Sequence, residues 1–230
     1  MSTFKRFGLT LAVLFFTMNT WAIELDTEEK KLGYIIGMDI GKSLREQGTT
    51  VDLDSLIDAV RATYNGDALA MTTEEAAQVR REYVEKRQAE QQAEAAAVGQ
   101  TNLVEGQKFL AENATKEGVQ TTASGLQYKV ETMGTGPKPV ATDTVKVHYR
   151  GTLLDGTEFD SSYARNEPIS FGLNRVIAGW TEGVQLMPVG SKFMFYIAPD
   201  LAYGEGGGGP IPPNSTLVFE VELLDIETPE

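Results

Sequence analysis

The sequence predicts an α+β protein in two parts: an all-α region with a long connecting helix, then a C-terminal antiparallel sheet wrapped on one short helix. Residues 23–116 are predicted to be wholly helical, with apolar residues recurring every three or four positions between residues 27 and 47. From residue 117 onward, Gly, Pro and β-branched or aromatic residues dominate, and apolar and polar residues alternate. With 230 residues and 41% apolar composition, the chain is long enough to bury a sizeable core. We therefore predict segments at 1–22, 23–70, 71–116 and 117–230.

Composition excludes several kinds of chemistry. The absence of Cys rules out disulfides, thiolate metal sites and cysteine nucleophiles, and a single histidine, His148, rules out zinc sites that need two. The formal net charge of −13 makes nucleic acid an unsuitable partner, because binding phosphate backbones requires concentrated Lys and Arg. We expect neither a metal nor another cofactor.

Residues 1–22 have the features of a cleaved signal peptide. Lys5 and Arg6 precede an apolar run over residues 7–18, which is too short to span a bilayer, and Ala22 stands at the expected cleavage position. A buried N-terminal helix and an uncleaved anchor are the alternatives. Export without cysteines fits a bacterial periplasm, and association with the outer membrane or cell surface stays open.

Residues 27–47 are predicted to form a helix with a stripe of glycines. Gly33, Gly37 and Gly41 lie four apart, between apolar residues at helical spacing. Each glycine inside a helix costs about 1 kcal/mol relative to Ala, so three in register require a compensating gain. Close approach of another helix would provide it, and either a second chain or the same chain could supply that helix. Interleaved charges exclude a membrane-embedded version of this motif.

A second helix is predicted from Asp52 or Asp54, either of which can cap it, to a stop at Asn65-Gly66. Together the first two helices contain few large apolar residues. A small domain with so thin a core often depends on oligomerisation, so we expect a homodimer formed through these helices.

A long polar helix is predicted from Thr72, which with Glu75 reads as a capping box, to about Asn113. The segment is rich in Ala, Glu, Gln, Lys and Arg, and only Gly99 and Gly106 interrupt its helical composition. Such a helix usually bridges domains through solvent. No heptad seam persists along it, which argues against a coiled coil.

The C-terminal segment shows four alternating runs, typical of half-buried strands: residues 126–130, 145–149, 193–197 and 217–221. A turn is predicted at residues 154–157, and the single helix of this segment at residues 176–187.

Five short runs in the C-terminal segment resemble the FKBP-type peptidyl-prolyl cis-trans isomerases, in the family's order and approximate spacing. They are Val147–Gly151, Phe159–Ser162, Val176–Trp180, Ala202–Gly204 and Ile211–Phe219. The helical half resembles the dimeric periplasmic FKBPs of the macrophage infectivity potentiator group, by architecture and by a few residues such as Ile36–Asp39.

The resemblance implies rotation about X–Pro peptide bonds, which is slow because amide resonance imposes a barrier of about 20 kcal/mol. Rotation requires no nucleophile, metal or redox partner. An apolar pocket that disfavours the charge-separated planar imide would assist it. The resemblance places six residues in the pocket walls, although these side chains could instead simply fill a small core: Tyr149, Phe159, Val176, Ile177, Trp180 and Phe219.

Further roles also follow from the resemblance. Asp160 is expected in the pocket, near the substrate or a neighbouring Tyr, and Tyr203 would bond the substrate carbonyl. Arg165 is expected near Asp160. Asp160 and Arg165 could each also be ordinary surface charges. Ile211 is expected among the substrate-binding residues, as is Ile169, which stands where many relatives have Phe.

Two further sequence features bear on the predicted site: a glycine-rich segment and the single histidine. The glycine-rich segment 204–210 differs from the loop of eukaryotic relatives, and its four consecutive glycines predict mobility. It lacks the Lys-Ser/Thr of a phosphate-binding loop. His148 should face away from Tyr149 by strand alternation and is assigned no catalytic role.

Three functions remain open. The first is a dimeric isomerase that assists folding of exported, proline-containing polypeptides and that rapamycin-type macrolides would inhibit. The second is a chaperone whose dimeric helical cradle binds unfolded chains. The third is an envelope interaction module that uses the pocket without turnover.

Overall fold

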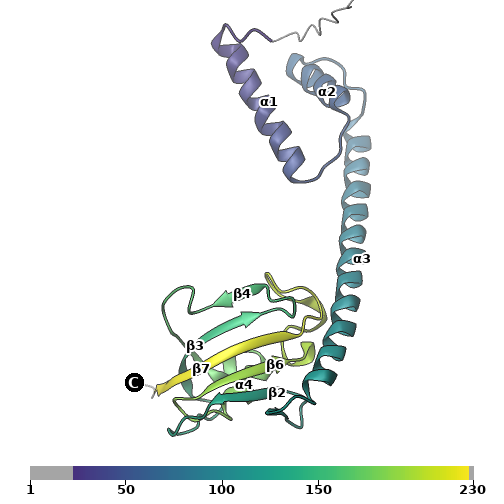
Figure 1. Cartoon of the computed structure of the whole chain (residues 1–230). Coiled ribbons are helices and arrows are strands. Elements are labelled where there is room, and N and C mark those ends of the chain that lie inside the picture. Colours follow the sequence, from purple (N-terminus) through teal and green to yellow (C-terminus); the bar gives the residue numbers. More distant parts are fainter. Residues whose placement is uncertain (1–22, 228–230) are drawn as a thin grey trace, which may run out of the picture. The chain divides into compact units, whose positions relative to one another are not determined.

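The computed structural model of the chain describes residues 23–227, so the predicted signal peptide at residues 1–22 lies outside the described residues. The chain divides into two compact units, the first ending at Thr73 and the second running from Glu74 onward. Figure 1 shows the helices of the first unit and, in the second, a long helix followed by a sheet. Within the described residues, no helix is both long enough and apolar enough to cross a membrane.

The first unit contains two helices with capped ends. Helix α1 spans Glu28–Glu46, and the Thr27 side chain accepts a hydrogen bond from the Lys30 backbone N–H. Helix α2 spans Leu53–Asn65; Asp52 caps its start, and Gly66 ends it in the left-handed conformation with φ 75°. Of the two predicted caps, Asp52 is therefore the one used. No residue of either helix is buried by the described chain.

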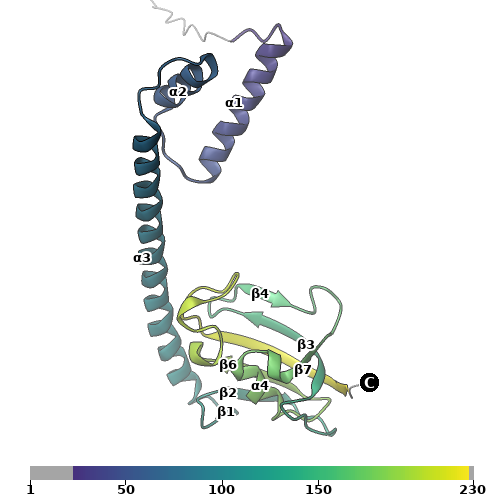
Figure 2. The same cartoon turned by 180° about the vertical axis from the view of Figure 1, so that it is seen from behind.

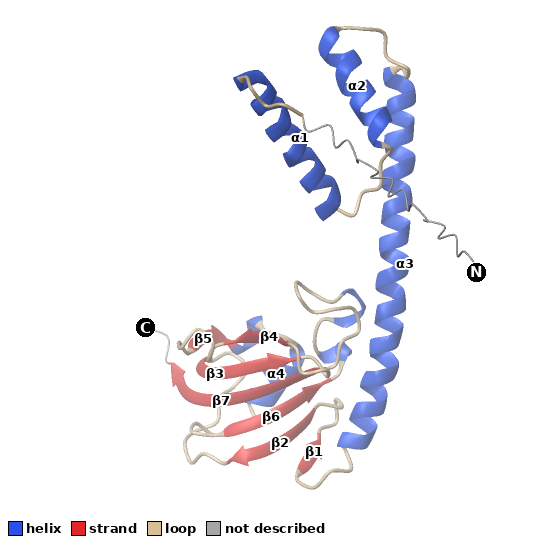
Figure 3. Ribbon diagram, turned by 45° about the horizontal axis from the view of Figure 1, so that its top comes forward, coloured by secondary structure: helices blue, strands red, loops and turns tan. Residues whose placement is uncertain are grey.

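Helix α3 spans Thr73–Asn113, 41 residues without interruption, as the sequence predicted, and all but its first residue belong to the second unit. At 1.5 Å per residue it is roughly 60 Å long. Its only buried residues are Gly99, Gly106 and Asn113, all in its C-terminal half. This half lies beside the sheet (Figure 3), whereas the N-terminal half is exposed along most of its length.

The sheet has seven strands, and all of its pairings are antiparallel. The order is β1-β2-β6-β7-β3-β4, and β5 pairs with β3 beside β4. The strands span Val119–Thr121 (β1), Gln127–Thr132 (β2), Thr144–Thr152 (β3), Glu158–Ser161 (β4), Ile169–Gly172 (β5), Lys192–Ile197 (β6) and Leu217–Glu227 (β7). Helix α4, Ala178–Val184, lies against one face of the sheet (Figure 2).

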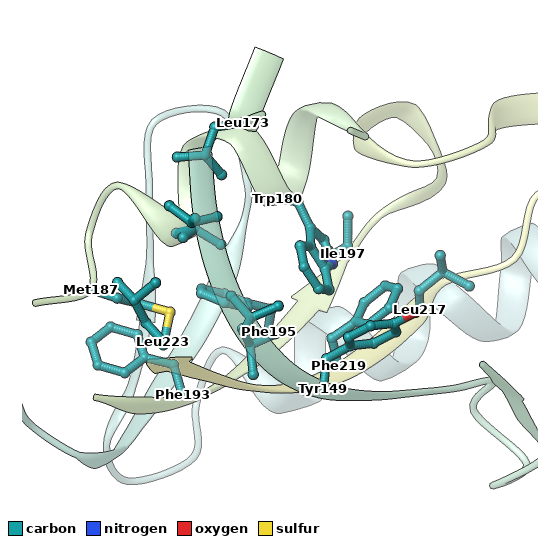
Figure 4. Packing of buried hydrophobic residues seen from close by; sticks show 14 of the residues in the cluster. Tyr149, Leu173, Trp180, Met187, Phe193, Phe195, Ile197, Leu217, Phe219 and Leu223 are labelled. Atoms are coloured by element: carbon teal, nitrogen blue, oxygen red, sulfur yellow. The ribbon is translucent and has the colours of Figure 1, made fainter. Parts of the chain in front are cut away.

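The core fills the space between α4 and the sheet. Alternate residues of β3, β6 and β7 are buried, as expected for strands with one face toward a core. Gly179 and Gly183 allow α4 to approach β6, because an added Cβ would lie 2.6 Å from an atom of Ile197 or Phe195 respectively. Figure 4 shows Met187, Phe193 and Leu223 at one end of this core and the group around Trp180 at the other.

Two differences from the predicted elements have physical reasons. The predicted helix at 176–187 is shorter, because Val176 and Ile177 have extended ψ values of 176° and 149° and lead into α4. Strands β1, β4 and β5 were not predicted, since they are only three or four residues long and too short to show alternation.

Candidate active site

A cavity of about 640 Å³ opens between the sheet, the start of α4 and the loop that follows β6. It contains ten of the eleven predicted site residues, drawn from segments as distant in sequence as β3 and β7. The complete lining is Tyr149, Phe159, Asp160, Ile169, Phe171, Arg175, Val176, Ile177, Trp180, Tyr203, Gly208, Pro210, Ile211 and Phe219. The eleventh, Arg165, does not line the cavity and instead contacts two residues that do.

Aromatic rings packed edge to face form the wall around Trp180. The Trp180 ring centroid lies 5.1 Å from that of Phe219 and 5.3 Å from that of Tyr149, at 83° and 87°. Phe159 meets Phe219 at 5.4 Å and 84°. Such pairs contribute about 0.5–1.5 kcal/mol each beyond the area they bury. The rings therefore hold one another in place and present a rigid, mostly apolar surface.

Gly151 makes room for two of these rings. A Cβ at this position would lie 2.6 Å from the Phe159 ring and 2.7 Å from the Phe219 ring. The glycine of the Tyr149-Arg150-Gly151 run is thus required by close ring packing near the C-terminal end of β3.

Asp160 is paired with two partners rather than left as an isolated surface charge. Its carboxylate accepts hydrogen bonds from the Tyr149 hydroxyl and, at 2.6 Å, from Arg165 Nη1. Arg165 Nη2 also donates to the Tyr149 hydroxyl oxygen at 3.0 Å. The three side chains form a closed polar triangle at one edge of a mostly apolar pocket, whose lining also includes Arg175 and Tyr203.

The triangle fixes the charges of its members. Partial burial opposes ionisation of Asp160, but the hydrogen bonds from Arg165 and Tyr149 prevail and lower the pKa of its carboxyl. Burial, together with the hydrogen bond to Asp160, raises the pKa of Tyr149. At neutral pH, Asp160 is therefore ionised and Tyr149 keeps its proton.

Ser162, which the sequence analysis quoted only within a motif, holds the backbone of Tyr149. The Tyr149 N–H donates to Ser162 Oγ at 2.7 Å, and the Ser162 N–H donates to the Tyr149 carbonyl at 3.0 Å. His148 lies on the other side of β3, where its ring stacks on Tyr163 at 4.7 Å. It does not line the pocket, in agreement with the predicted orientation.

The glycine-rich loop forms a hydrogen-bonded turn. Gly208 and Ile211 exchange backbone hydrogen bonds of 2.9 Å, and the Asn214 N–H donates to the Gly204 carbonyl at 2.9 Å. Gly207 and Gly209 have φ values of 66° and 56°, which L-residues with side chains rarely adopt. Backbone geometry thus accounts for these two glycines, and the mobility of the segment stays a prediction.

Four lining residues were not predicted: Phe171, Arg175, Gly208 and Pro210. Phe171 contacts Trp180, with ring centroids 5.3 Å apart, but it reaches the pocket only through the pairing of β5 with β3. The sequence offered one usable signal, the apolar Phe171 two positions after Ile169. Among the described residues, no cluster of three or more His, Cys, Asp or Glu could hold a metal ion.

Two family models match the chain and together cover most of it. The model for FKBP-type peptidyl-prolyl cis-trans isomerase matches residues 135–224, and the model for the domain amino-terminal to it matches residues 29–130. The chain belongs to the FKBP-type peptidyl-prolyl cis-trans isomerases, and it is an enzyme of that class.

Named relatives resemble the chain over most of its length. An FKBP-type peptidyl-prolyl cis-trans isomerase FkpA from Aeromonas hydrophila is 51% identical over 212 residues, 90% of this chain and 79% of the relative. The outer membrane protein MIP of Legionella longbeachae is 39% identical over 95% of this chain and 97% of its own length. The crystal structure of FkpA from Escherichia coli matches with a TM-score of 0.73 at 39% identity, covering 89% of this chain and 99% of that one. The predicted family and fold class are confirmed.

Proposed function

We propose that isomerisation takes place in the pocket around Trp180, that the enzyme acts as an exported homodimer, and that its substrates are proline-containing segments of other exported polypeptides. The observation that supports this most strongly is the cavity itself. It combines a packed aromatic wall with a single polar triangle, and it gathers residues from four strands, the start of α4 and the loop after β6.

The pocket suits the chemistry of X–Pro rotation. The barrier arises from amide resonance, which places partial charge on the carbonyl oxygen and the nitrogen. An environment poor in water stabilises this charge-separated planar form less than water does and so favours the twisted imide. In the proposed complex the proline ring would lie against Trp180, flanked by Phe219 and Tyr149.

Polar groups would orient the substrate without forming a bond to it. Tyr203, 45% exposed at the mouth of the pocket, would donate to a substrate carbonyl, and the backbone N–H of Ile177 would bind the same peptide. Asp160 and Arg165 would hold Tyr149 in its edge-on contact with Trp180. Val176, Ile211 and Ile169 would contact the residues that flank the proline.

The dimer proposal rests on α1. An added Cβ at Gly33, Gly37 or Gly41 would meet nothing within 4 Å, so no other described part of the helical unit packs on the stripe. Leu32 and Ile36 are 60% and 51% exposed. A second copy of the chain would cover this surface and offset the helical cost of the glycines.

Peptide isomerisation by residues 23–230, with and without rapamycin, tests the proposed site. We expect turnover that rapamycin abolishes, because the macrolide would occupy the same pocket. A folded protein whose turnover persists with rapamycin bound would contradict the assignment of the site.

A second function is favoured by the same exposed helices. The apolar side chains of α1 and α2, Val60 and Ile57 among them, would form a surface suited to unfolded chains as well as to a second copy. We expect residues 23–116 alone to suppress aggregation of a refolding protein. Absence of suppression by a folded fragment would leave isomerisation as the sole proposed activity.

A further inference from the structure

We propose that the C-terminal half of α3 positions one wall of the active site, through Gly99, Asn102 and Gly106. This inference rests on the proposed location of the active site. The three residues follow one another at intervals of three and four, so they lie on one face of the helix. All three contact segment 213–216, the last part of the loop between β6 and β7.

Each contact is close and specific. Asn102 Nδ2 donates to the Pro213 carbonyl at 2.8 Å. An added Cβ at Gly99 would lie 3.1 Å from Pro213 Cβ, and one at Gly106 would overlap the Thr216 hydroxyl oxygen. The glycines therefore allow the helix backbone to lie directly against the loop segment. This explains two residues that interrupt the helical composition and are less favourable in a helix than Ala.

The packing at Gly106 is close enough to leave a polar group unpaired. Thr216 is almost fully buried, and its hydroxyl has no hydrogen-bond partner in the described chain. A buried hydroxyl without a partner is destabilising, so we infer that the close contact between helix and loop compensates for it.

A short chain of contacts connects this segment to the pocket. The Asn214 N–H bonds to the Gly204 carbonyl, which ties segment 213–216 to the residue after Tyr203. Gly208 and Ile211, which bond to each other, both line the cavity. Gly208 also lies against the Tyr203 ring, since an added Cβ there would be 3.0 Å from it. Displacing segment 213–216 would therefore move the wall formed by Tyr203 and Ile211.

Separate contacts attach the end of α3 to the sheet. Asn113 donates to Gln127 Oε1 at 2.9 Å, and Gln127 Nε2 donates to the Leu110 carbonyl at 2.8 Å. Phe109 packs on Tyr196 with ring centroids 5.9 Å apart. The helix would consequently stay attached when its contact with the loop is weakened, so the two roles can be tested separately.

The test compares full-length mature chains, residues 23–230, carrying Asn102→Ala or Gly106→Ala. Thr101→Ala is the matched control, because Thr101 is the exposed neighbour of Asn102 and bonds only within the helix. Turnover of a short peptide with one Leu-Pro bond gives kcat and KM. Amide hydrogen exchange of Gly208, Ile211 and Asn214 is followed together with that of Phe195 in β6.

We expect both variants to raise KM about fivefold with little change in kcat. Asn102→Ala loses one hydrogen bond, and Gly106→Ala adds a methyl group that overlaps the Thr216 hydroxyl and displaces the loop. Exchange should accelerate in the loop amides alone. Gly106→Ala improves helix propensity, so its effect would not come from a weaker helix. The double variant Gly106→Ala/Thr216→Ala removes the overlapping oxygen and should restore KM to within about twofold, since the remaining Thr216 Cβ would lie 3.3 Å away.

Unchanged KM in both variants would overturn the proposal, as would equal acceleration of exchange in the loop and in β6. The variant Asp160→Leu separates this failure from failure of the proposed site. If Asp160→Leu reduces turnover while the α3 variants do not, the positioning role alone is wrong. If Asp160→Leu also leaves turnover intact, the location of the active site is wrong.

Discussion

The two units of the chain differ in how they bury apolar surface. The sheet unit encloses sixteen buried apolar residues between α4 and the sheet, with Phe193, Phe195 and Met187 almost fully covered. Helices α1 and α2 bury nothing within the described chain, although both are well capped and regular. A sequence can therefore encode regular, well-capped helices without encoding a core that buries them.

This difference also separates catalysis, which we assign to the sheet unit, from association with a partner, which we assign to the helical unit. A pocket built from the sheet, α4 and the loop after β6 can be complete in a single chain. The exposed faces of α1 and α2 require a partner surface, which we propose is a second copy. Variants in each unit can test this division.

Core truncation should have the largest effect. Phe195→Ala should destabilise the sheet unit by about 3–5 kcal/mol, because it removes a fully buried ring against which Gly183 packs. Denaturant unfolding followed by the fluorescence of Trp180, the only tryptophan after residue 22, measures it. Tyr64→Ala is the control in α2: Tyr64 is 91% exposed, so the change should stay within about 0.5 kcal/mol. Similar losses in both variants would contradict the division.

Disruption of the glycine stripe should have the second-largest effect. Gly37→Leu places a large side chain at the centre of the proposed helix contact and should weaken the dimer at least about a hundredfold, through overpacking of roughly 3 kcal/mol. Sedimentation equilibrium of residues 23–230 measures the dissociation constant. Asp39→Leu, about 200° around α1 from Gly37, adds the same side chain away from the stripe. Equal behaviour of the two variants would show that the stripe is not the interface.

Loss of the polar triangle should have a smaller effect than either change, and it should appear in kcat/KM. Asp160→Leu leaves Arg165 and Tyr149 without their shared acceptor and should lower kcat/KM roughly tenfold, in line with loss of a charge-assisted hydrogen bond. Tyr149→Phe keeps the ring but removes the hydroxyl, and it should lower kcat/KM about fivefold. Glu158→Leu, on the same strand but exposed, is the control. Full turnover by the folded Asp160→Leu protein would contradict the proposed location of the active site.

Change of pH should have the smallest effect. Because the pKa of Asp160 is lowered, its contribution to stability is present above the ordinary carboxyl pKa of about 3.9 and is lost only as pH falls through its lower folded value. Since the pKa of Tyr149 is raised, this hydroxyl stays protonated. We expect kcat/KM on a short peptide to be constant between about pH 5 and 8. A titration step within this range that disappears in Asp160→Asn would contradict the assigned charges.

The sequence predicted the strands and helix ends whose surroundings leave a pattern in neighbouring residues. Strands β2, β3, β6 and β7 have one face in the core, so their side chains alternate, and Asp52 and Gly66 mark the ends of α2. Strand β5 could not be found this way, because its four residues are held by pairing with β3. The pocket residue Phe171 was missed for the same reason.

Contacts between distant segments were also beyond the sequence patterns. The resemblance placed Asp160 near a tyrosine, but the bond from Arg165 to the Tyr149 hydroxyl depends on how β3 and the segment after β4 meet. Within a helix of mainly polar composition, nothing marked Asn102 as a partner of Pro213, 111 residues away. Such contacts depend on tertiary packing, which local periodicity does not encode.

In the proposed assembly the catalytic pocket is complete in one chain, while the helical unit depends on a second. The most direct test is kcat/KM per chain of Gly37→Leu on a short X–Pro peptide, at a concentration where sedimentation shows it to be monomeric. We predict a value within about twofold of that of the wild-type dimer, because no residue of α1 or α2 lines the described pocket. A loss of tenfold or more in a folded monomer would contradict the claim and show that the site needs the second chain.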